Sequence, residues 1–332
     1  MKLLLAAACL WLAGPAVAEL AVPEGAQAAP PSQGGPVEVT LLFGLLDIVD
    51  IDDKAQRFEI DAYTELSWQD PRLAARAGEE ALRVISLEDI WNPGLVILND
   101  RGIDRLLPEV ATVDAQGWVT VRHRLAGPLV VDLDLHEFPF DQQILSIDIV
   151  SYLHGLAELE YSSASELVAR VDEFSAEGWI FEPLPVRHST FRLRESGEGT
   201  PLISFQLRAQ RDALFHVITL VFPMILILLL AWVVHWLPPQ LSPPRIGTAS
   251  ATVFSVIAFG VSLRLGLPQV GYLTVADRFV LGCIILVGVS LAVAVMTARR
   301  VDAGDIDRAR LLAKIMCWVF PLAVLLIVQF SR

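Results

Sequence analysis

The sequence predicts an all-β domain, either an antiparallel sandwich or a barrel, followed by a bundle of four membrane-spanning helices. Apolar residues make up 54% of the 332 residues and charged residues only 19%, which is too apolar for an ordinary soluble protein. Residues 19–212 hold 34 acidic against 15 basic side chains, whereas the remainder holds 4 against 10. Short alternating segments fill the first part and long apolar runs fill the second. An acidic domain in water therefore precedes a basic part in the membrane.

The first 18 residues predict a secretory signal peptide. Lys2 is the positive start, Leu3–Leu12 is an apolar run too short to span a membrane, and Ala16–Ala18 is a small-residue cleavage site. Residues 19–36, rich in Pro, Ala and Gly, predict a flexible lead into the domain. No cysteine occurs between residues 19 and 212, so no disulfide is expected there.

Residues 37–212 predict the β domain, because apolar and polar residues alternate and turn residues recur about every ten positions. The Ala- and Arg-rich stretch Pro71–Glu80 predicts a short helix inside it. The predicted strands include Val37–Val49, Arg57–Trp68, Trp118–Arg124, Ile144–Val150, Trp179–Pro185 and Leu202–Ala209.

Residues 213–332 predict four spans, each near the length of about 20 residues that crosses a bilayer. These spans are Leu214–Leu237, Arg245–Leu265, Phe279–Thr297 and Arg310–Phe330. The loop before the fourth span carries Arg299, Arg300 and Arg308, which by the positive-inside rule makes it cytoplasmic. Four spans then put the β domain and the C-terminus on the outer side.

The segment Pro243–Pro268, which holds the second span, is unusually polar for such a helix. It carries five hydroxyl residues in or near the span and no charge in its middle. Small and hydroxyl side chains suit either tight helix packing or the wall of a water-filled path. One helix cannot enclose water, so the second alternative requires several copies around an axis.

Six motifs between Val37 and the C-terminus resemble those of the pentameric ligand-gated ion channels, most closely their bacterial branch. The most specific is Phe138–Gln143, FPFDQQ, which is similar to the FPFDxQ loop of that family. Val131 and Leu145 stand where animal members have two bridging cysteines. The other five motifs are Trp68–Leu73 (WQDPRL), Trp91–Pro93 (WNP), Asp52–Ala55 (DDKA), Arg211 with Pro223 in the first span, and Leu267–Tyr272 (LPQVGY).

The resemblance implies an immunoglobulin-like extracellular sandwich followed by a four-helix transmembrane bundle, assembled as a homopentamer in a lipid bilayer. It implies a bacterial inner membrane with the sandwich in the periplasm. It further implies a pore for small inorganic ions that opens on binding a small-molecule agonist or protons. It implies no catalytic activity, and we expect no cofactor, no metal and no nucleic-acid partner. The alternative is a non-conducting membrane receptor with a packing helix as its second span, although the short cytoplasmic loop leaves no room for a signalling domain.

Periodicity and resemblance select different faces of the second span for the pore. Thr248, Thr252, Ser255 and Ser262 share one helical face. The resemblance selects a face about 100° away, and we adopt it because both ends of the span match without an insertion. There Phe254 is expected to form an apolar gate that closes by excluding water. The pore face is Gly247, Ala251, Phe254, Ala258, Val261 and Leu265.

The resemblance also assigns ion selectivity to Arg245 and Arg264, near the two ends of that span. No Asp or Glu lies between His235 and Arg264, so we expect an anion-permeable or weakly selective pore. The alternative is a cation-selective channel, because five acidic β domains would concentrate cations above the pore. Screening within about 8–10 Å weakens that diffuse charge.

By resemblance, several residues are expected to couple the β domain to the pore where the two parts meet. Asp141 and Arg211 would form a shielded ion pair that Asp53 could share, and such a pair is costly to break. The alternative is a static pair that only joins the two parts. The coupling residues are Asp53, Lys54, Phe138, Pro139, Asp141, Arg211, Pro268 and Tyr272.

The agonist is expected between neighbouring β domains. Rings that would form a cage for an amine are few, since Leu98 and Val150 stand at two positions that are aromatic in relatives. The candidates that remain are Tyr63, Tyr152, Phe191, Arg122 and Arg124, of which the two arginines could meet an anion.

Overall fold

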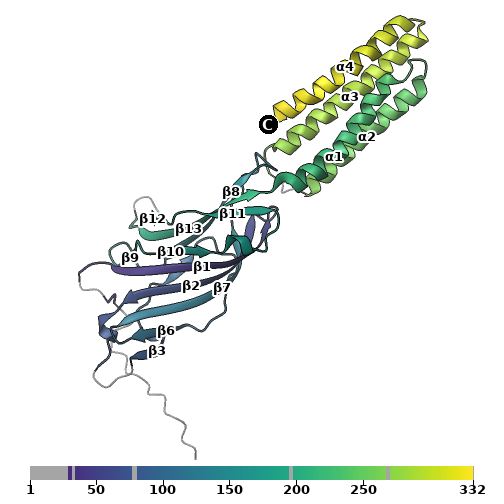
Figure 1. The fold of residues 1–332 in the computed structure, drawn as a ribbon. Helices are drawn as coiled ribbons and strands as arrows, with labels where there is room; N and C mark the ends of the chain where they lie inside the picture. The colour runs from purple at the N-terminus through teal and green to yellow at the C-terminus, as the bar shows by residue number, and fades with distance from the viewer. Residues whose placement is uncertain (1–28, 32–33, 77–80, 194–196, 267–269, 332) are drawn as a thin grey trace, which may run out of the picture.

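The computed structural model describes residues 29–31, 34–76, 81–193, 197–266 and 270–331. The predicted signal peptide, most of the predicted lead and Pro268 lie outside the described residues. Figure 1 shows a β domain joined end to end with a rod of four helices. The C-terminal end of the last helix lies at the joint.

The larger sheet of the β domain follows the strand order β10-β1-β2-β7-β6-β3, with β9 beside β1 and β5 beside β7. Its long central strands alternate buried and less buried residues, as the sequence pattern requires for a sheet with one covered face. The eight strands are β1 (Val37–Asp52), β2 (Arg57–Gln69), β3 (Leu82–Ser86), β5 (Asp104–Arg105), β6 (Val110–Asp114), β7 (Trp118–Val130), β9 (Leu159–Tyr161) and β10 (Glu166–Ala169).

The smaller sheet follows the order β11-β13-β8-β4, with β12 also paired to β13. The rings of Phe43 on β1 and Phe205 on β13 stack 5.2 Å apart and join the two sheets through the core. The predicted sandwich is therefore confirmed. The five strands are β4 (Leu95–Ile97), β8 (Gln142–Ser151), β11 (Trp179–Pro183), β12 (Arg187–Phe191) and β13 (Thr200–Arg211).

The predicted helix over Pro71–Glu80 is wrong in its described part. Only Pro71–Leu73 forms a single 3₁₀ turn, capped by the Asp70 side chain that accepts from the Arg72 amide. The chain continues in extended conformation at Ala74. High Ala and Arg content favours a helix, but the proline and the capping aspartate fix only its first turn here.

The four predicted spans are confirmed as long apolar helices, and each is long and apolar enough to cross a membrane. The third begins four residues earlier than predicted because Thr274 and Asp277 form a reciprocal capping box. The helices are α1 (Ala213–Val233, extended by a 3₁₀ turn at Val234–Trp236), α2 (Ser242–Gly266), α3 (Val275–Asp302) and α4 (Ile306–Ser331).

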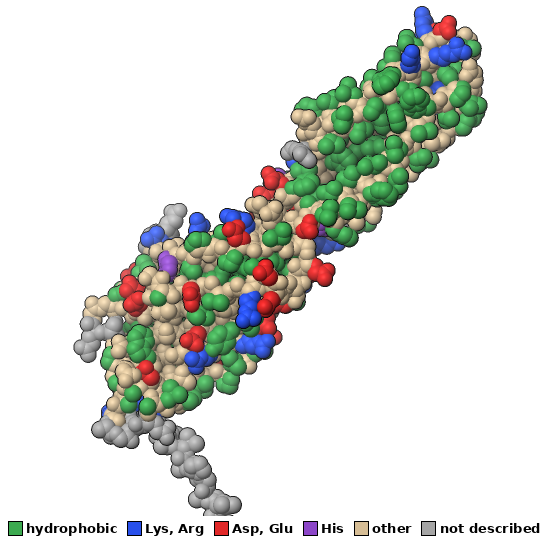
Figure 2. Space-filling view, viewed as in Figure 1, with side chains coloured by type: hydrophobic (Ala, Val, Ile, Leu, Met, Phe, Trp, Pro, Cys, Tyr) green, Lys and Arg blue, Asp and Glu red, His purple; other side chains and the backbone are tan. Residues whose placement is uncertain are grey.

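The surface of the bundle is covered with apolar side chains, as Figure 2 shows. Lys and Arg side chains gather at the end of the bundle farthest from the β domain, where α3 turns into α4. Apolar sides and a basic end match a bilayer span with a cytoplasmic loop. The chain is therefore a multi-pass membrane protein.

Candidate functional site

Arg211, the last residue of β13, lies at the joint between the β domain and the helices. Its side chain is 4% exposed and binds two carboxylates at once. Asp141 accepts from Nε at 2.8 Å and from Nη2 at 3.2 Å, and Asp53 accepts from both terminal nitrogens at 2.9 Å. The structure thus ties the loop after β1, the loop before β8 and the start of α1 to one guanidinium group.

Two aromatic rings enclose the same guanidinium. Its carbon lies 4.2 Å from the ring centre of Trp179 and 5.0 Å from that of Phe138. Trp179 is the cross-strand partner of Arg211, which places the two side chains on one face. Burial by itself disfavours the charge, but the hydrogen bonds that the guanidinium donates to Asp53 and Asp141 outweigh it, so the pKa of Arg211 is raised. The guanidinium of Arg211 therefore stays positively charged at neutral pH.

Gln143 holds the buried carboxylate of Asp141 from its other side. Its amide nitrogen donates to Asp141 Oδ2 at 2.6 Å and to the carbonyl of Asp134 at 2.7 Å. Its amide oxygen accepts from the Asp134 backbone at 3.0 Å. Gln143 is the last residue of the FPFDQQ motif, so its position in that motif was the available signal for this role. Trp179 carried no comparable signal, because only strand pairing brings it to Arg211.

The loop between β7 and β8 docks onto the start of α3. The carbonyls of His136 and Phe138 accept from the backbone amides of Val275 at 3.0 Å and of Ala276 at 3.3 Å. These amides belong to the first helical turn, whose donors have no partner within the helix. The peptide bond between Phe138 and Pro139 is cis. This loop therefore contributes backbone acceptors to a helix of the bundle.

Tyr272, in the link between α2 and α3, contacts the same loop. Its hydroxyl accepts from the Leu135 amide at 3.0 Å, and its ring stacks on that of His136 with 3.7 Å between the ring centres. His136 also contacts Asp134 at 2.6 Å. The backbone amide and the side chain of His136 lower the pKa of Asp134. Nothing in the sequence pattern pointed to His136.

Lys54 makes a direct contact between the β domain and the end of α2. Its ammonium group donates to the carbonyl of Leu265 at 2.6 Å. The last carbonyls of a helix have no partner within the helix and carry partial negative charge, so a cation is favoured there. A shift of the loop that holds Lys54 therefore displaces or breaks a contact with the end of α2.

One face of α2 is exposed along its whole length in the subunit. Phe254 and Leu265 are each 73% exposed, and only a small share of the span is buried against the other helices. The exposed positions at this face are Gly247, Ala251, Phe254, Ala258, Val261 and Leu265. They are the six residues that the resemblance assigns to the pore.

The hydroxyl face of α2 is different. Thr252 is buried and donates to the carbonyl of Ala249 at 2.8 Å, and Ser255 donates to that of Ala251 at 2.9 Å. These hydroxyls are satisfied by the backbone of their own helix, so they do not require water. Thr248 is half-buried, whereas Ser255 and Ser262 are exposed.

The two arginines of α2 differ in their surroundings. Arg245 is 1% exposed, and none of its guanidinium nitrogens has a hydrogen-bond partner among the described residues. Its expected place at a pore mouth is therefore not supported, because the side chain is turned into the bundle instead. Arg264 is exposed and lies 3.2 Å from Asp277.

Of the five candidate agonist residues, the structure brings three together. Tyr63, Arg122 and Arg124 lie on the outward face of the larger sheet, where Tyr63 pairs with Arg124 in register. Arg122 binds Glu65 and Arg124 binds Asp61, each at 2.8 Å, so both guanidinium groups are neutralised. Tyr152, after β8, and Phe191, at the end of β12, belong to the smaller sheet and its connections.

Comparisons with known proteins agree with this architecture. Residues 26–212 match the neurotransmitter-gated ion-channel ligand binding domain, and residues 220–302 match the neurotransmitter-gated ion-channel transmembrane region. The chain is 26% identical over 250 residues to a proton-gated ion channel of Gloeobacter violaceus, covering 74% of this chain and 68% of that protein. It is 25% identical over 276 residues to pH-sensitive chloride channel 2 of Anopheles gambiae, covering 75% of this chain and 43% of that protein. The chain thus matches less than half the length of the insect relative.

Proposed function

This chain belongs to the neurotransmitter-gated ion-channel family, and from that premise we propose that five copies form a homopentamer around a pore lined by α2. Membership makes the chain a ligand-gated ion channel subunit and not an enzyme. We further propose a bacterial inner membrane, with the β domain in the periplasm. The bacterial relative and the basic loop between α3 and α4 support this placement.

The observation that carries the proposal is the exposed face of α2. Six residues over five turns stay uncovered, and they combine small side chains with the large apolar Phe254. Lipid alone could cover Phe254 and Leu265, but the small residues favour close approach to an axis shared with other copies. Rings of Phe254 then narrow the path and exclude water when the pore is closed.

The cluster at Arg211 supports coupling between agonist and pore. The guanidinium of Arg211, directly before α1, joins two loops of the β domain. Lys54 connects the first of these loops to the end of α2, and Tyr272 connects the second to the link after α2. A movement of the sheets therefore reaches α2 through side chains in contact. Pro268 belongs to the same proposal by resemblance alone.

Replacing Lys54 with Met removes its contact with the Leu265 carbonyl and keeps a side chain of similar length. A hydrogen bond from a charged group contributes about 1.5–3 kcal/mol when buried and less at this exposed site. We expect the agonist concentration for half-maximal current to change about threefold to tenfold. Concentration–response curves measure this, with Lys314→Met at the far end of the bundle as the matched control. An unchanged curve for Lys54→Met would remove this residue from the coupling set.

We propose that the pore is anion-permeable or weakly selective. Support comes from the absence of any acidic residue in α2 and from Arg264, which is exposed at the end next to the β domain, where it pairs with Asp277 of α3. One of the relatives is named as a chloride channel. Arg245 has no part in this proposal, because it is buried within the bundle.

The reversal potential in an asymmetric sodium chloride gradient tests this selectivity. Its sign is expected to follow chloride, and Arg264→Gln is expected to move it toward the sodium value because a positive ring is lost. Arg208→Gln removes the same charge from β13, where Arg208 pairs with Glu182 at the surface of the β domain, and is expected to leave the reversal potential unchanged. A reversal potential at the sodium value in the unmodified protein would show a cation channel instead.

We propose that the agonist, if it is a small molecule, binds between neighbouring β domains. Tyr63, with Arg122 and Arg124, would face Tyr152 and Phe191 of the next subunit, which fits their location on different sheets. Protons are the second candidate, because both relatives are named for a response to pH. Recording from the reconstituted protein during steps of external pH, and then during a screen of amines and carboxylates, distinguishes the two. Silence under every condition would favour the non-conducting receptor.

A further inference from the structure

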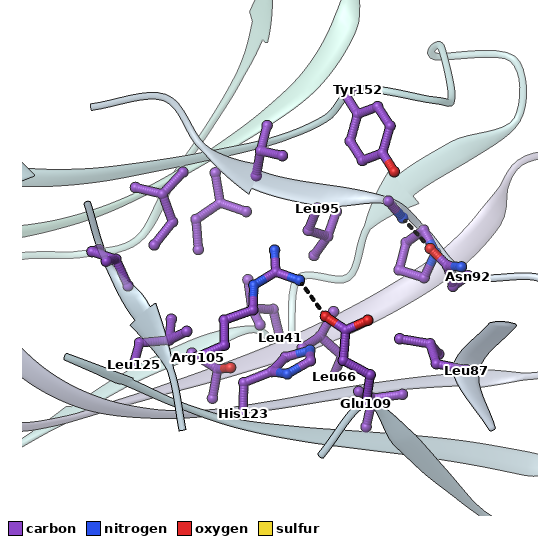
Figure 3. A pocket seen from close by; sticks show the side chains of 18 of the residues that line it. Leu41, Leu66, Leu87, Asn92, Leu95, Arg105, Glu109, His123, Leu125 and Tyr152 are labelled. Atoms are coloured by element: carbon purple, nitrogen blue, oxygen red, sulfur yellow. Dashed lines mark hydrogen bonds and ion pairs between the residues drawn. The ribbon is translucent and has the colours of Figure 1, made fainter. Parts of the chain in front are cut away.

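The β domain of a single subunit contains a cavity of about 260 Å³. Strands β2 and β7 contribute its floor, and the segments 87–97 and 100–109 contribute its walls. Figure 3 shows Arg105 and Glu109 joined by an ion pair directly beside the ring of His123, with Tyr152 on the opposite side of the view. Most of the remaining lining is leucine and other apolar side chains. The cavity thus combines an apolar body with one charged side.

Two residues of this lining each carry a buried polar atom that has no hydrogen-bond partner among the described residues. They are Nδ1 of His123 and the indole nitrogen of Trp68. Buried polar atoms are nearly always paired in folded proteins, and each exception calls for an explanation such as a bound group. A ligand that donates to His123 provides that explanation for one of them.

The charges around the cavity favour a cation. Asp100 and Glu109 supply two carboxylates against the single guanidinium of Arg105, and Glu88, which has a partner of its own, is not counted. The carboxylate of Asp100 accepts from the backbone amides of Gly102 and Ile103, so it stabilises the turn that follows it. Burial, with Arg105 nearby, lowers the pKa of His123, although Glu109 opposes this. His123 is therefore neutral near pH 7 and adds no positive charge to the cavity.

We propose that this cavity binds a small organic cation, with its ammonium group between Glu109 and His123 and its apolar part among the leucines. The volume lies just below the range of about 300–1,000 Å³ for drug-sized ligands, so the ligand is a small amine. The site lies inside one subunit and shares Tyr152 with the surface proposed for an agonist between subunits. Binding here does not depend on conduction, and its test needs no current.

Three probes of nearly equal shape test the charge preference on the full chain purified in detergent. Benzylamine carries a positive charge, benzyl alcohol is neutral and benzoate is negative. Titration calorimetry is expected to show saturable binding of benzylamine and at least about fivefold weaker binding of the other two. Tighter binding of benzoate, or no saturable binding of benzylamine, would overturn the proposal.

Two variants at the ion pair locate the site by effects of opposite sign. Glu109→Gln is expected to weaken benzylamine binding about fivefold to tenfold, since it removes a carboxylate and frees Arg105. Arg105→Gln is expected to strengthen it, since it frees Glu109. A mere disturbance of this exposed pair would weaken binding in both variants, and that result would contradict the proposal. Glu182→Gln, which removes one carboxylate from an ion pair with Arg208 outside the cavity, serves as the matched control.

Discussion

Replacing Arg211 with Ala is expected to abolish agonist-evoked current while the subunits still assemble. The substitution leaves Asp141, which is 1% exposed, and Asp53 without their shared partner. Removing one partner of a buried ion pair costs about 3–5 kcal/mol. It also removes the only group among the described residues that binds both loop carboxylates at once. We therefore expect that a movement of the β domain is no longer transmitted to α2.

Current recording and size-exclusion chromatography of the same preparation measure these two effects. Arg208→Ala is the matched control, because Arg208 lies on the same strand and pairs with Glu182 at the surface. If Arg211→Ala fails to fold, Asp53→Asn tests the same contact, since it keeps the more buried pair with Asp141. A normal concentration–response curve for both Arg211→Ala and Asp53→Asn would refute the coupling role.

Replacing Phe254 with Ser is expected to produce a channel that conducts without agonist. Phe254 is the largest side chain on the exposed face of α2 and is 73% exposed in the subunit. Five hydroxyl groups in place of five rings widen the path and bind water, which removes the dewetted barrier. We expect the resting current to rise on the order of tenfold or more, because a loss of about 1.4 kcal/mol already changes a rate tenfold.

The resting current per assembled channel in lipid bilayers measures this effect. Phe222→Ser makes the same change on α1, where the side chain is 62% exposed, and is expected to leave the resting current low. A leak in both variants would point to a general loosening of the bundle. An unchanged current in Phe254→Ser alone would mean that another ring closes the pore.

The fold was predictable because its signals are local. Alternation along β2 and the apolar length of each span depend on neighbouring residues, and both were confirmed. Pro71–Glu80 failed because its composition favours a helix, whereas Asp70 and Pro71 build only one turn. Which face of α2 lines the pore stays a prediction, because the hydroxyl face combines the buried Thr252 with the exposed Ser255 and Ser262.

The joint between the two parts was predictable only where motifs lie in it. Asp141, Gln143 and Arg211 belong to or adjoin such motifs. Trp179 and His136 do not, and they reach the joint through strand pairing and loop docking between residues far apart in the chain. The burial of Arg245 was not predictable for a related reason, since it depends on how α2 packs against the other helices and not on the sequence around it.

The carbonyls of His136 and Phe138 complete the first turn of α3, which limits how this protein can be recombined with its relatives. A chimera spliced at residue 212 would take the donors from one parent and the acceptors from the other. Such a graft stays intact only if the recipient loop presents two carbonyls in the same register. The safer design takes the segment between β7 and β8 from the parent that supplies α3, so that donors and acceptors come from one parent.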